Sequence, residues 1–463
     1  MRIVALITIL FAAASGAETV VSAADYDSIQ AAIDAHPGKM IFVPDGDYAI
    51  NKKLRIASDN GGLYGYGRIV QTNPAEVALE IEHAAGVRIS GITLTRAEGK
   101  QDAEDSGLFC YDARDTVIEN VRVIDCRARA AAIALRECRN CTVRDCEVRN
   151  YKRIAVDDRT AEGETLYGYA FHCIDGTGIL VERCTGTVIE NNRVVENNLF
   201  PTPEMKAKYN LGALTEGRYP SKQGALATEA FRSNYVGNWH QGSAITVTGP
   251  EDTRHSSIRG NYIENAAQGI DLHCDNALVT DNTVNHGMMG IKATHGSRNL
   301  LIANNMLTHI DLWGILLNPG AASHAAEPAT AEKVARVANV DGGTIIANNI
   351  ISDYGYGHEF WNYGGREPDH PGSYAIALYE GQLDTNPPLT DVIVTGNMVY
   401  DTGRDQVIVD GQPRIEPPRY RYAVYVGPWG GEEPGPTYPQ SIHFSNNLFH
   451  PGSMGVSNVE LKP

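Results

Sequence analysis

Positive charge is scarce in this chain. Its 463 residues include 39 Lys and Arg against 56 Asp and Glu, which gives a formal net charge of −17 at pH 7. A protein that binds nucleic acid needs a basic surface to displace counterions from the phosphates, so this balance argues against a nucleic-acid partner. The charge also repels acidic polymers, but salt screens that repulsion beyond about 8–10 Å. A locally basic groove therefore still fits an acidic glycan.

Long apolar runs are also lacking. Beyond the start of the chain, no apolar run approaches the roughly 20 residues that cross a bilayer, so no membrane span is expected. The run Ile3 to Ala14 follows an arginine and leads to two small-residue cleavage sequences, Ser15-Gly16-Ala17 and Val21-Ser22-Ala23. This pattern is typical of a signal peptide. We expect residues 1–23 to be removed, residues 24–463 to form one domain, and the protein to be secreted or periplasmic.

Cysteine is present without the spacing of a zinc site. The eight cysteines lie between Cys110 and Cys274, and no second pair accompanies Cys138-x-x-Cys141. When the coil 132–148 is aligned with 178–194, Cys138 falls on Cys184. That alignment suits either a stack of small buried side chains or one disulfide in an oxidising compartment.

A recurring pattern, apolar-x-x-Asn-apolar, organises most of the chain. Its first two steps, 261 to 282 and 282 to 305, are 21 and 23 residues, inside the range of solenoid repeats. The segments are short, β-branched and broken by Asn, Asp and Gly, which favours strands over helices. We predict a coiled solenoid of short parallel strands. The asparagines of the pattern are Asn261, Asn282, Asn305, Asn349, Asn397 and Asn447.

An asparagine at one fixed place in each coil has a structural use. It can turn the corner in a left-handed backbone conformation while its side-chain amide bonds to its copies in adjacent coils. We therefore expect these asparagines to be structural. Ahead of the coils, Ser28 to Ala35 has a capping serine and helical spacing, which predicts a helix that covers the open first coil.

The helical cap, the strand Met40-Ile41-Phe42-Val43, the turn Pro44-Asp45-Gly46-Asp47-Tyr48 and the Asn-marked coils together resemble the pectin-lyase-like right-handed parallel β-helix superfamily. The resemblance implies an all-β, single-stranded right-handed parallel β-helix with an N-terminal helical cap and long loop insertions. That superfamily includes polysaccharide lyases, glycoside hydrolases, uronate epimerases, phage tailspikes and non-catalytic surface proteins. The function must therefore be argued from the site.

Three consecutive coils, Ala244 to Thr248, Gly269 to His273 and Gly290 to His295, align through their glycine and apolar residues. Side chains alternate along a strand, so every second residue of these coils points outward on one sheet. Parallel coils lie about 4.8 Å apart, which makes Asp271 and Lys292 vertical neighbours with His273 on the same face. The inward residues are Ile245, Val247, Ile270, Leu272, Ile291 and Ala293, and the outward ones are Thr246, Thr248, Asp271, His273, Lys292 and Thr294.

The strand Gly269-Ile270-Asp271-Leu272-His273 also resembles the Gly-Ile/Phe-Asp-Pro-His strand of β-helical mannuronan C5-epimerases, in which the Asp and His act on the C5 proton of the sugar. The match carries over to Asp271 and His273, while Leu272 stands in the place of proline. The resemblance implies that these two residues act on a C–H bond beside a uronate carboxylate.

Breaking that C–H bond needs a base at C5, a cation or donor for the enediolate, and an acid for the leaving oxygen. We assign His273 as the base, Lys292 as the cation that neutralises the carboxylate, and Asp271 as the residue that orients them. The same base and cation serve a lyase and an epimerase. The candidates for the proton donor are His295, His240 and Tyr235.

A loop wall is expected beside this cluster. The insert Leu199 to Lys222 immediately precedes a coil rich in aromatic and basic residues, and long loops on a rigid scaffold often form binding surfaces. The predicted substrate-binding residues are Arg232, Tyr235, Trp239, His240 and Asp275.

Other functions remain open at this point. Asp271 with Asp275 or Glu229 offers the carboxyl pair of a glycoside hydrolase. The Asp271–Lys292 pair could also be an idle surface ion pair. Oxygen ligands suit calcium, although no spaced carboxylate loop is visible. We predict an enzyme that degrades a polysaccharide, first a lyase acting on a uronate-containing glycan by β-elimination, then a glycoside hydrolase, then a C5-epimerase, and last a non-catalytic glycan-binding solenoid.

Overall fold

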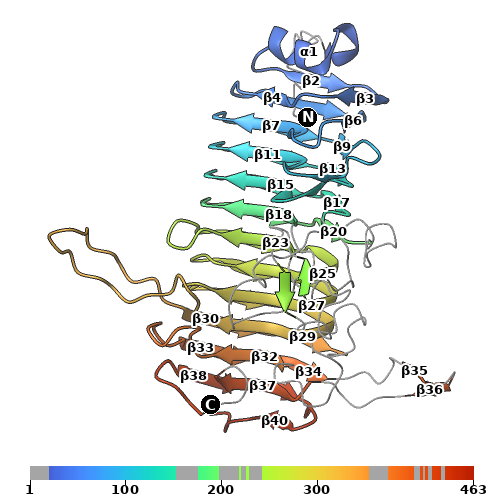
Figure 1. Cartoon of the computed structure of the whole chain (residues 1–463). Helices are drawn as coiled ribbons and strands as arrows, with labels where there is room; N and C mark the ends of the chain where they lie inside the picture. The colour runs from blue at the N-terminus through green and yellow to red at the C-terminus, as the bar shows by residue number, and fades with distance from the viewer. Residues whose placement is uncertain are drawn as a thin grey trace, which may run out of the picture.

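The structure is a computed structural model that describes residues 20–152, 176–197, 218–220, 226–228, 242–353, 374–400, 407–409, 412–414, 420–428 and 433–462. Its strands stack as a column of coils, with β2 near one end and β40 at the other (Figure 1). Successive coils pair in parallel, and each coil passes through three faces in turn. The prediction of a parallel β-helix is confirmed.

The first face is a 13-stranded sheet, here called sheet 1. Its strands are β1 (Val21–Ser22), β2 (Met40–Val43), β5 (Gly62–Gly65), β8 (Arg88–Ser90), β12 (Val117–Glu119), β16 (Thr142–Arg144), β19 (Val188–Glu190), β24 (Ser257–Arg259), β26 (Leu278–Thr280), β28 (Leu301–Ala303), β30 (Gly342–Ala347), β33 (Thr390–Thr395) and β38 (Gln440–Ser445).

The other two faces, sheets 2 and 3, merge into one 21-stranded sheet. The long strands β25 (Tyr262–Leu272), β27 (Thr283–Thr294) and β29 (Met306–Asn318) begin in sheet 2 and end in sheet 3. Sheet 2 also contains β3 (Asp47–Ile50), β6 (Arg68–Gln71), β9 (Thr93–Arg96), β13 (Arg122–Ile124), β17 (Glu147–Arg149), β20 (Arg193–Val195), β31 (Ile350–Ser352), β34 (Met398–Tyr400) and β39 (Leu448–Phe449).

Sheet 3 is the face that carries the candidate site. Besides the ends of the three long strands, it contains β4 (Leu54–Ile56), β7 (Leu79–Glu82), β11 (Leu108–Tyr111), β15 (Ala131–Arg136), β18 (Thr177–Glu182), β23 (Ser243–Thr248), β32 (Tyr374–Tyr379), β37 (Tyr422–Gly427) and β40 (Gly455–Ser457). Three short pairs lie outside these sheets: β10 (Asp102–Ala103) with β14 (Arg127–Ala128), β21 (Arg218–Pro220) with β22 (Leu226–Thr228), and β35 (Val407–Val409) with β36 (Gln412–Arg414).

A short helix caps the first coils, as predicted. The helix α1 (Ile29–Ala35) begins after Ser28, whose Oγ accepts a hydrogen bond from the Ala31 amide at 3.1 Å. Ile29 and Ala32 are buried against the column, and the 3-10 helix η1 (Ala23–Asp25) precedes α1. Within the described part of the chain, no helix has the length and apolar character needed to cross a membrane.

The strand β1 bears on the predicted signal peptide. Val21 pairs with Ile41 and Ser22 with Phe42 of β2, and Ala23 is buried in the core. A cleavage after Ala17 would keep these contacts, whereas a cleavage after Ala23 would remove them. The cleavage site and export both stay predictions.

The core follows the predicted alternation. Ile245, Ile270, Ile291, Ile315 and Ile376 stand in register in consecutive coils, and each is fully buried. Because the inward column is continuous, the residues on either side of it are held on the outer face of sheet 3.

A ladder of asparagines, buried except for the half-buried Asn447 at its end, joins the coils at the corner between sheets 1 and 2. The Nδ2 of each asparagine donates to the Oδ1 of the next at 2.9–3.0 Å. The backbone amide of the same residue donates to that oxygen as well, for example from Asn282 to Asn305 at 3.0 Å. The ladder consists of Asn192, Asn261, Asn282, Asn305, Asn349, Asn397 and Asn447.

The corner itself differs from the prediction. The left-handed backbone conformation is adopted by the residue before the ladder asparagine, such as Asn304 (φ 58°) before Asn305 and Gly260 (φ 64°) before Asn261. Two consecutive residues therefore have separate roles at the corner. The exposed residue adopts the left-handed conformation that makes the turn. The buried asparagine after it keeps a backbone conformation that directs its side-chain amide along the column.

The seven described cysteines are free and buried. The Cys138 amide donates to Cys184 Sγ at 3.2 Å, as expected for stacked neighbours in adjacent coils. Of the two alternatives for this pair, the structure has stacking of small side chains and no disulfide between them.

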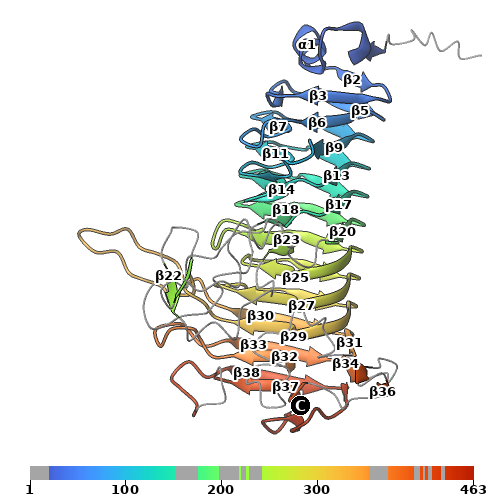
Figure 2. The ribbon, with the colours of Figure 1, turned by 45° about the vertical axis from the view of Figure 1, so that its right-hand side comes forward.

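An extended arm leaves the column after β29. Residues 319–341 project to one side (Figure 1, Figure 2) and fold back on themselves through antiparallel bridges between His324 and Asn339 and between Glu327 and Arg336. Val334 and Val337, near its end, are 90% and 74% exposed. The base of this arm lies beside the candidate site.

We expect the ladder to stabilise the fold. Replacing Asn305 by alanine removes the acceptor of two buried N–H groups of Asn282, and each unsatisfied buried group costs about 1–3 kcal/mol. Asn305→Ala should lower the free energy of unfolding by about 2–6 kcal/mol, measured by urea unfolding followed by circular dichroism. Asn304→Gly, at the exposed turn residue, should change it by less than about 1 kcal/mol because glycine adopts positive φ readily. Equal losses in the two variants would contradict the role of the ladder.

Candidate functional site

Asp271 and Lys292 are direct neighbours in consecutive coils of sheet 3. They are partners in the register of β25 and β27, and Lys292 Nζ lies 3.1 Å from Asp271 Oδ1. The side chains are 10% and 18% exposed, so the pair is sheltered from solvent. This shelter argues against the idle surface ion pair, which is solvated and contributes little.

His273 completes the cluster from the same strand as Asp271. Its Nε2 lies 3.2 Å from Asp271 Oδ1, as an ion-pair contact that is off the line of a well-formed hydrogen bond. Its Nδ1 lies 2.9 Å from the hydroxyl of Thr248 in the preceding coil. In the neutral imidazole these partners suit a proton on Nε2 and a lone pair on Nδ1 that accepts from Thr248.

A polar row extends from Lys292 across the sheet. Lys292 Nζ donates to Gln268 Oε1 at 3.3 Å, and Ser243 Oγ donates to the same oxygen at 3.4 Å. Gln268 and Ser243 are buried, and they stand two residues before Ile270 and Ile245 in their strands. The sequence analysis did not name them, because strict alternation places Gln268 on the same side as the inward Ile270, whereas the structure brings its side chain to Lys292.

The charges of the cluster change the acidity of Asp271. Burial alone would raise the pKa of this carboxyl group. The attraction of Lys292, and then that of His273, outweighs burial and holds the pKa of Asp271 well below its usual range. Asp271 is therefore an ionised acceptor at neutral pH, which orients its neighbours and does not serve as an acid.

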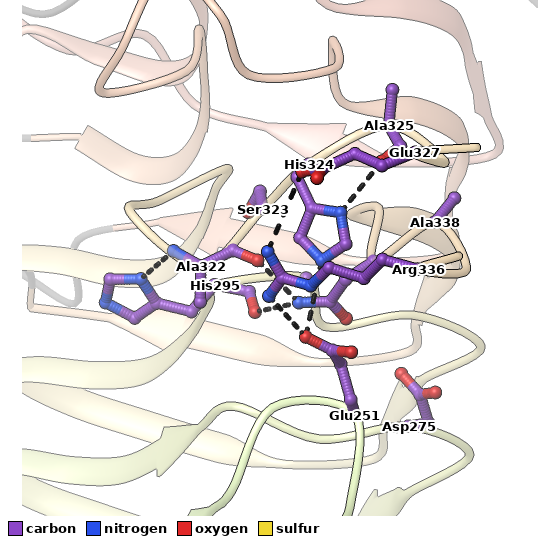
Figure 3. Close-up of polar contacts among 12 residues, drawn as sticks. Glu251, Asp275, His295, Ala322, Ser323, His324, Ala325, Glu327, Arg336 and Ala338 are labelled. Atoms are coloured by element: carbon purple, nitrogen blue, oxygen red, sulfur yellow. Dashed lines mark hydrogen bonds and ion pairs between the residues drawn. The ribbon is translucent and has the colours of Figure 1, made fainter. Parts of the chain in front are cut away.

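His295 stands over His273 on the following turn. The two rings make an edge-to-face contact with centroids 4.8 Å apart. Burial first, and then the positive charge of His273 and Lys292, lowers the pKa of His295 to about 4. The Ala322 amide lies 3.5 Å from His295 Nδ1 (Figure 3), which leaves the ring proton to Nε2. A neutral His295 is a hydrogen-bond donor rather than a strong acid.

The base of the arm is fixed against the turn that follows His295. The carboxylate of Asp341 accepts hydrogen bonds from the amides of Gly296 and Ser297 at 2.9–3.0 Å. Farther out, Arg336 donates to Glu251 at 2.6 Å and His324 Nε2 lies 3.3 Å from the same oxygen (Figure 3). These contacts hold the backbone of Ala322 at the ring of His295.

Asp275, predicted to bind substrate, lies at the turn after β25. It is 6% exposed, and its Oδ2 accepts from Nε and an Nη of Arg298 at 2.9 and 2.7 Å. One oxygen of this carboxylate is thus paired with Arg298 of the next coil, and the contact of Asp275 with substrate stays a prediction.

The other predicted binding residues are outside the described part of the chain. They are Arg232, Tyr235, Trp239 and His240, together with Glu229 of the hydrolase alternative. The structure therefore brings together four of the sequence-predicted catalytic residues, Asp271, His273, Lys292 and His295, on one wall. Their catalytic roles stay predictions.

An apolar wall continues from the cluster along the outer face of sheet 3. Leu316 follows Lys292 in register, and Trp313 donates from Nε1 to the hydroxyl of Tyr379 at 3.1 Å. Trp313 and Tyr379 are 5% and 1% exposed, so both side chains are packed within this wall. Among the described residues, no group of three or more His, Cys, Asp or Glu is arranged to hold a metal ion.

We expect Lys292→Met to destabilise the protein in a pH-dependent way. Removing the ammonium leaves the ionised, buried Asp271 with one partner, and breaking a buried pair costs about 3–5 kcal/mol. The pKa of Asp271 is lower in the folded protein than in the unfolded chain. The pair therefore stabilises the fold at pH values above the unfolded pKa. This contribution to stability is lost as the pH falls through the folded pKa.

The measurement is urea unfolding of both proteins at pH 7 and near pH 4. The difference between them should be largest at pH 7 and should shrink toward pH 4, where Asp271 of the variant takes up a proton. Adding Asp271→Asn to Lys292→Met should recover most of the lost stability at pH 7, because no unpaired charge remains. A loss that is the same at both pH values would show that Lys292 stabilises by packing alone.

Solved structures of other proteins share this fold. The A-module of the mannuronan C-5 epimerase AlgE4 of Azotobacter vinelandii is 12% identical, with a TM-score of 0.53 over 95% of this chain and 98% of that chain. The surface adhesin PfbA of Streptococcus pneumoniae is 12% identical, with a TM-score of 0.52 over 95% and 93%. The Dettilon tailspike protein is 13% identical, with a TM-score of 0.51 over 92% and 66%. At these identities the likeness shows the fold alone.

The sequence itself carries a family signature. No curated protein matches this chain. The profile of the family described as "Right handed beta helix region" matches residues 72–307, which are 236 of the 463 residues. This span includes the coils that carry Asp271, His273, Lys292 and His295. The chain therefore belongs to the right-handed β-helix family, within the pectin-lyase-like superfamily that its repeats resemble.

Proposed function

We propose that this protein is a polysaccharide-active enzyme that cleaves a uronate-containing glycan by β-elimination. The observation that carries the proposal is the sheltered cluster in which one carboxylate oxygen of Asp271 lies 3.2 Å from His273 and 3.1 Å from Lys292. An imidazole, an ammonium and an orienting carboxylate on one wall are the groups that proton abstraction beside a carboxylate requires.

In this mechanism Lys292 binds the carboxylate of the sugar unit and stabilises the negative charge that develops on it. His273 removes the C5 proton through Nδ1, after substrate binding has displaced the Thr248 hydroxyl from this nitrogen. Asp271 holds Nε2 and stabilises the imidazolium that forms, as a buried carboxylate does for a catalytic histidine. The neutral His295 donates a hydrogen bond to the enediolate.

Elimination then completes the reaction. The C4–O4 bond breaks as the C4=C5 double bond forms, and the imidazolium of His273 gives its proton to the departing O4. One residue can carry out both proton transfers because the base and the leaving oxygen are on the same side of the ring in a syn elimination. The products are a new reducing end and an unsaturated uronate.

A C5-epimerase is the second candidate, because the fold is similar to that of a mannuronan C-5 epimerase and Asp271 and His273 match the catalytic strand of that family. An epimerase returns the proton on the opposite face of the sugar. The described members of the cluster all come from one wall, which supports elimination over epimerisation. A hydrolase is less well supported, because Asp271 is held ionised and Asp275 is bound to Arg298.

The test is incubation of the purified protein with pectic, alginate-type, glycosaminoglycan and sulfated marine polysaccharides. Ultraviolet absorbance reports the new double bond, and an assay of reducing ends reports cleavage. Both signals should rise together on one uronate polymer. Reducing ends without absorbance would mean hydrolysis, and inversion at C5 without either signal, detected by proton NMR, would mean epimerisation; each would overturn the proposal.

We expect His273→Ala to lower kcat on that polymer by about 10²–10⁴-fold, since this is the usual contribution of a general base. The fold should persist, as shown by an unchanged circular dichroism spectrum. His443→Ala is the matched control, because His443 is exposed on β38 of sheet 1, another face of the column. Full activity of the His273 variant would contradict its role as the base.

A further inference from the structure

Sheet 3 carries a second feature upstream of the cluster. A surface hollow of about 540 Å³ is lined by two aromatic rings and two ion pairs. Phe109 and Tyr111 lie nearly parallel with centroids 6.3 Å apart, and the guanidinium of Arg136 lies 5.8 Å from the centre of the Phe109 ring. The lining residues are Phe109, Tyr111, Arg136, Glu137, Glu182 and Arg183.

The hollow and the cluster lie on the same face, sheet 3. The same columns of outward-pointing side chains, aligned from coil to coil, run through both. Tyr111, Arg136 and Glu182 follow one another in register in β11, β15 and β18. Glu182 pairs with Thr248 of β23, and Thr248 contacts His273. The edge of the hollow is therefore two coils, or roughly 10 Å, from the catalytic imidazole.

A second column joins the same two places. Phe109 is followed in register by Ala134, Leu180, Thr246 and Asp271. These four steps span roughly 19 Å, the length of several units of an extended glycan. Ala134 is small and Leu180 is apolar, so no charged side chain of this column separates the aromatic ring from the cluster.

The chemistry of the hollow suits a sugar ring rather than an ion. Arg136 is paired with Glu182 at 2.7 Å and Arg183 with Glu137 at 3.8 Å, so the four charges cancel. Each pair places donors beside acceptors, and a hydroxyl group both donates and accepts. The faces of Phe109 and Tyr111, both partly exposed, offer apolar surface to the C–H side of a pyranose.

We propose that the hollow is a distal subsite that binds one pyranose unit of the same glycan chain whose bond is broken at the cluster. The identity of that chain rests on the proposed function. The subsite makes the enzyme specific for long substrates, because only a glycan that spans about 19 Å reaches both places. Its contribution to affinity does not depend on salt, since its charges cancel, whereas the contact of a uronate with Lys292 weakens as salt rises.

The experiment measures binding separately from turnover. His273→Ala serves as the parent so that no probe is cleaved, and affinity electrophoresis is run in gels that contain polygalacturonate, alginate, hyaluronan or neutral galactan. Phe109→Ala/Tyr111→Ala should raise the Kd of the parent for the retarding polymer about tenfold, because ring contacts of this kind contribute on that scale. The same double substitution should leave the Kd for a disaccharide of that polymer unchanged.

Two controls separate binding from folding. Tyr66→Ala, at a tyrosine that is 74% exposed in the turn after β5 and outside sheet 3, should leave every Kd unchanged. Thermal melting should show that the double variant is folded, and the tenfold loss should be equal at low and high salt. A double variant retarded like its parent, a loss seen equally with the disaccharide, or a parent that no gel retards would each overturn the subsite.

The subsite and the proposed reaction fail in different ways. Binding through Phe109 and Tyr111 with no product from the protein that retains His273 would refute β-elimination and keep the subsite. If the protein forms product but the double substitution does not change the Kd for the polymer, the subsite would be refuted and the reaction would stand.

Discussion

Hydrogen bonds between consecutive coils determine everything else in this molecule. The described strands pair in parallel from coil to coil, with one register shift between Gly287 and Met289 where β27 meets β29, and the asparagine ladder fixes the register at the corner between sheets 1 and 2. A slip of one residue would turn the isoleucine column outward and drive Asp271 and Lys292 into the core. The side chains of the cluster meet because these hydrogen bonds prevent the coils from sliding past one another. Its 3.1 Å ion pair is a direct result of the coil spacing.

The same rigidity holds a sheltered cation in place on a protein of net charge −17, as the proposed acidic substrate would require. Lys292 is held between Asp271 and Gln268 on a strand that is bonded on both sides. Its position in the strand fixes it, so little conformational freedom is lost when substrate binds. The overall charge acts at long range and is screened, whereas Lys292 acts in contact.

Repetition and alternation made the fold and the centre of the site predictable. Both are local signals, so the coils, the cap after Ser28 and the outward set around Asp271 could be predicted from the sequence. Asn192 was not counted among the asparagines of the pattern because a charged residue, Arg193, follows it. The left-handed turn was assigned one residue too late, since both corner residues are often asparagine. The contacts of Asp341 with Gly296 and of Arg336 with Glu251 join the arm to segments without a repeat, and no local pattern reports them.

The cysteines that stack in the core give the molecule a further property. Burial raises the pKa of the Cys126 and Cys146 thiols to about 12, so they stay protonated and unreactive while their coils are closed. Each coil of a solenoid contacts only its neighbours, and opening is therefore local. Each of the described thiols, between Cys110 and Cys274, therefore becomes reactive only when its own coil opens. The order in which a thiol reagent modifies them would record the order in which the coils of this half of the column come apart.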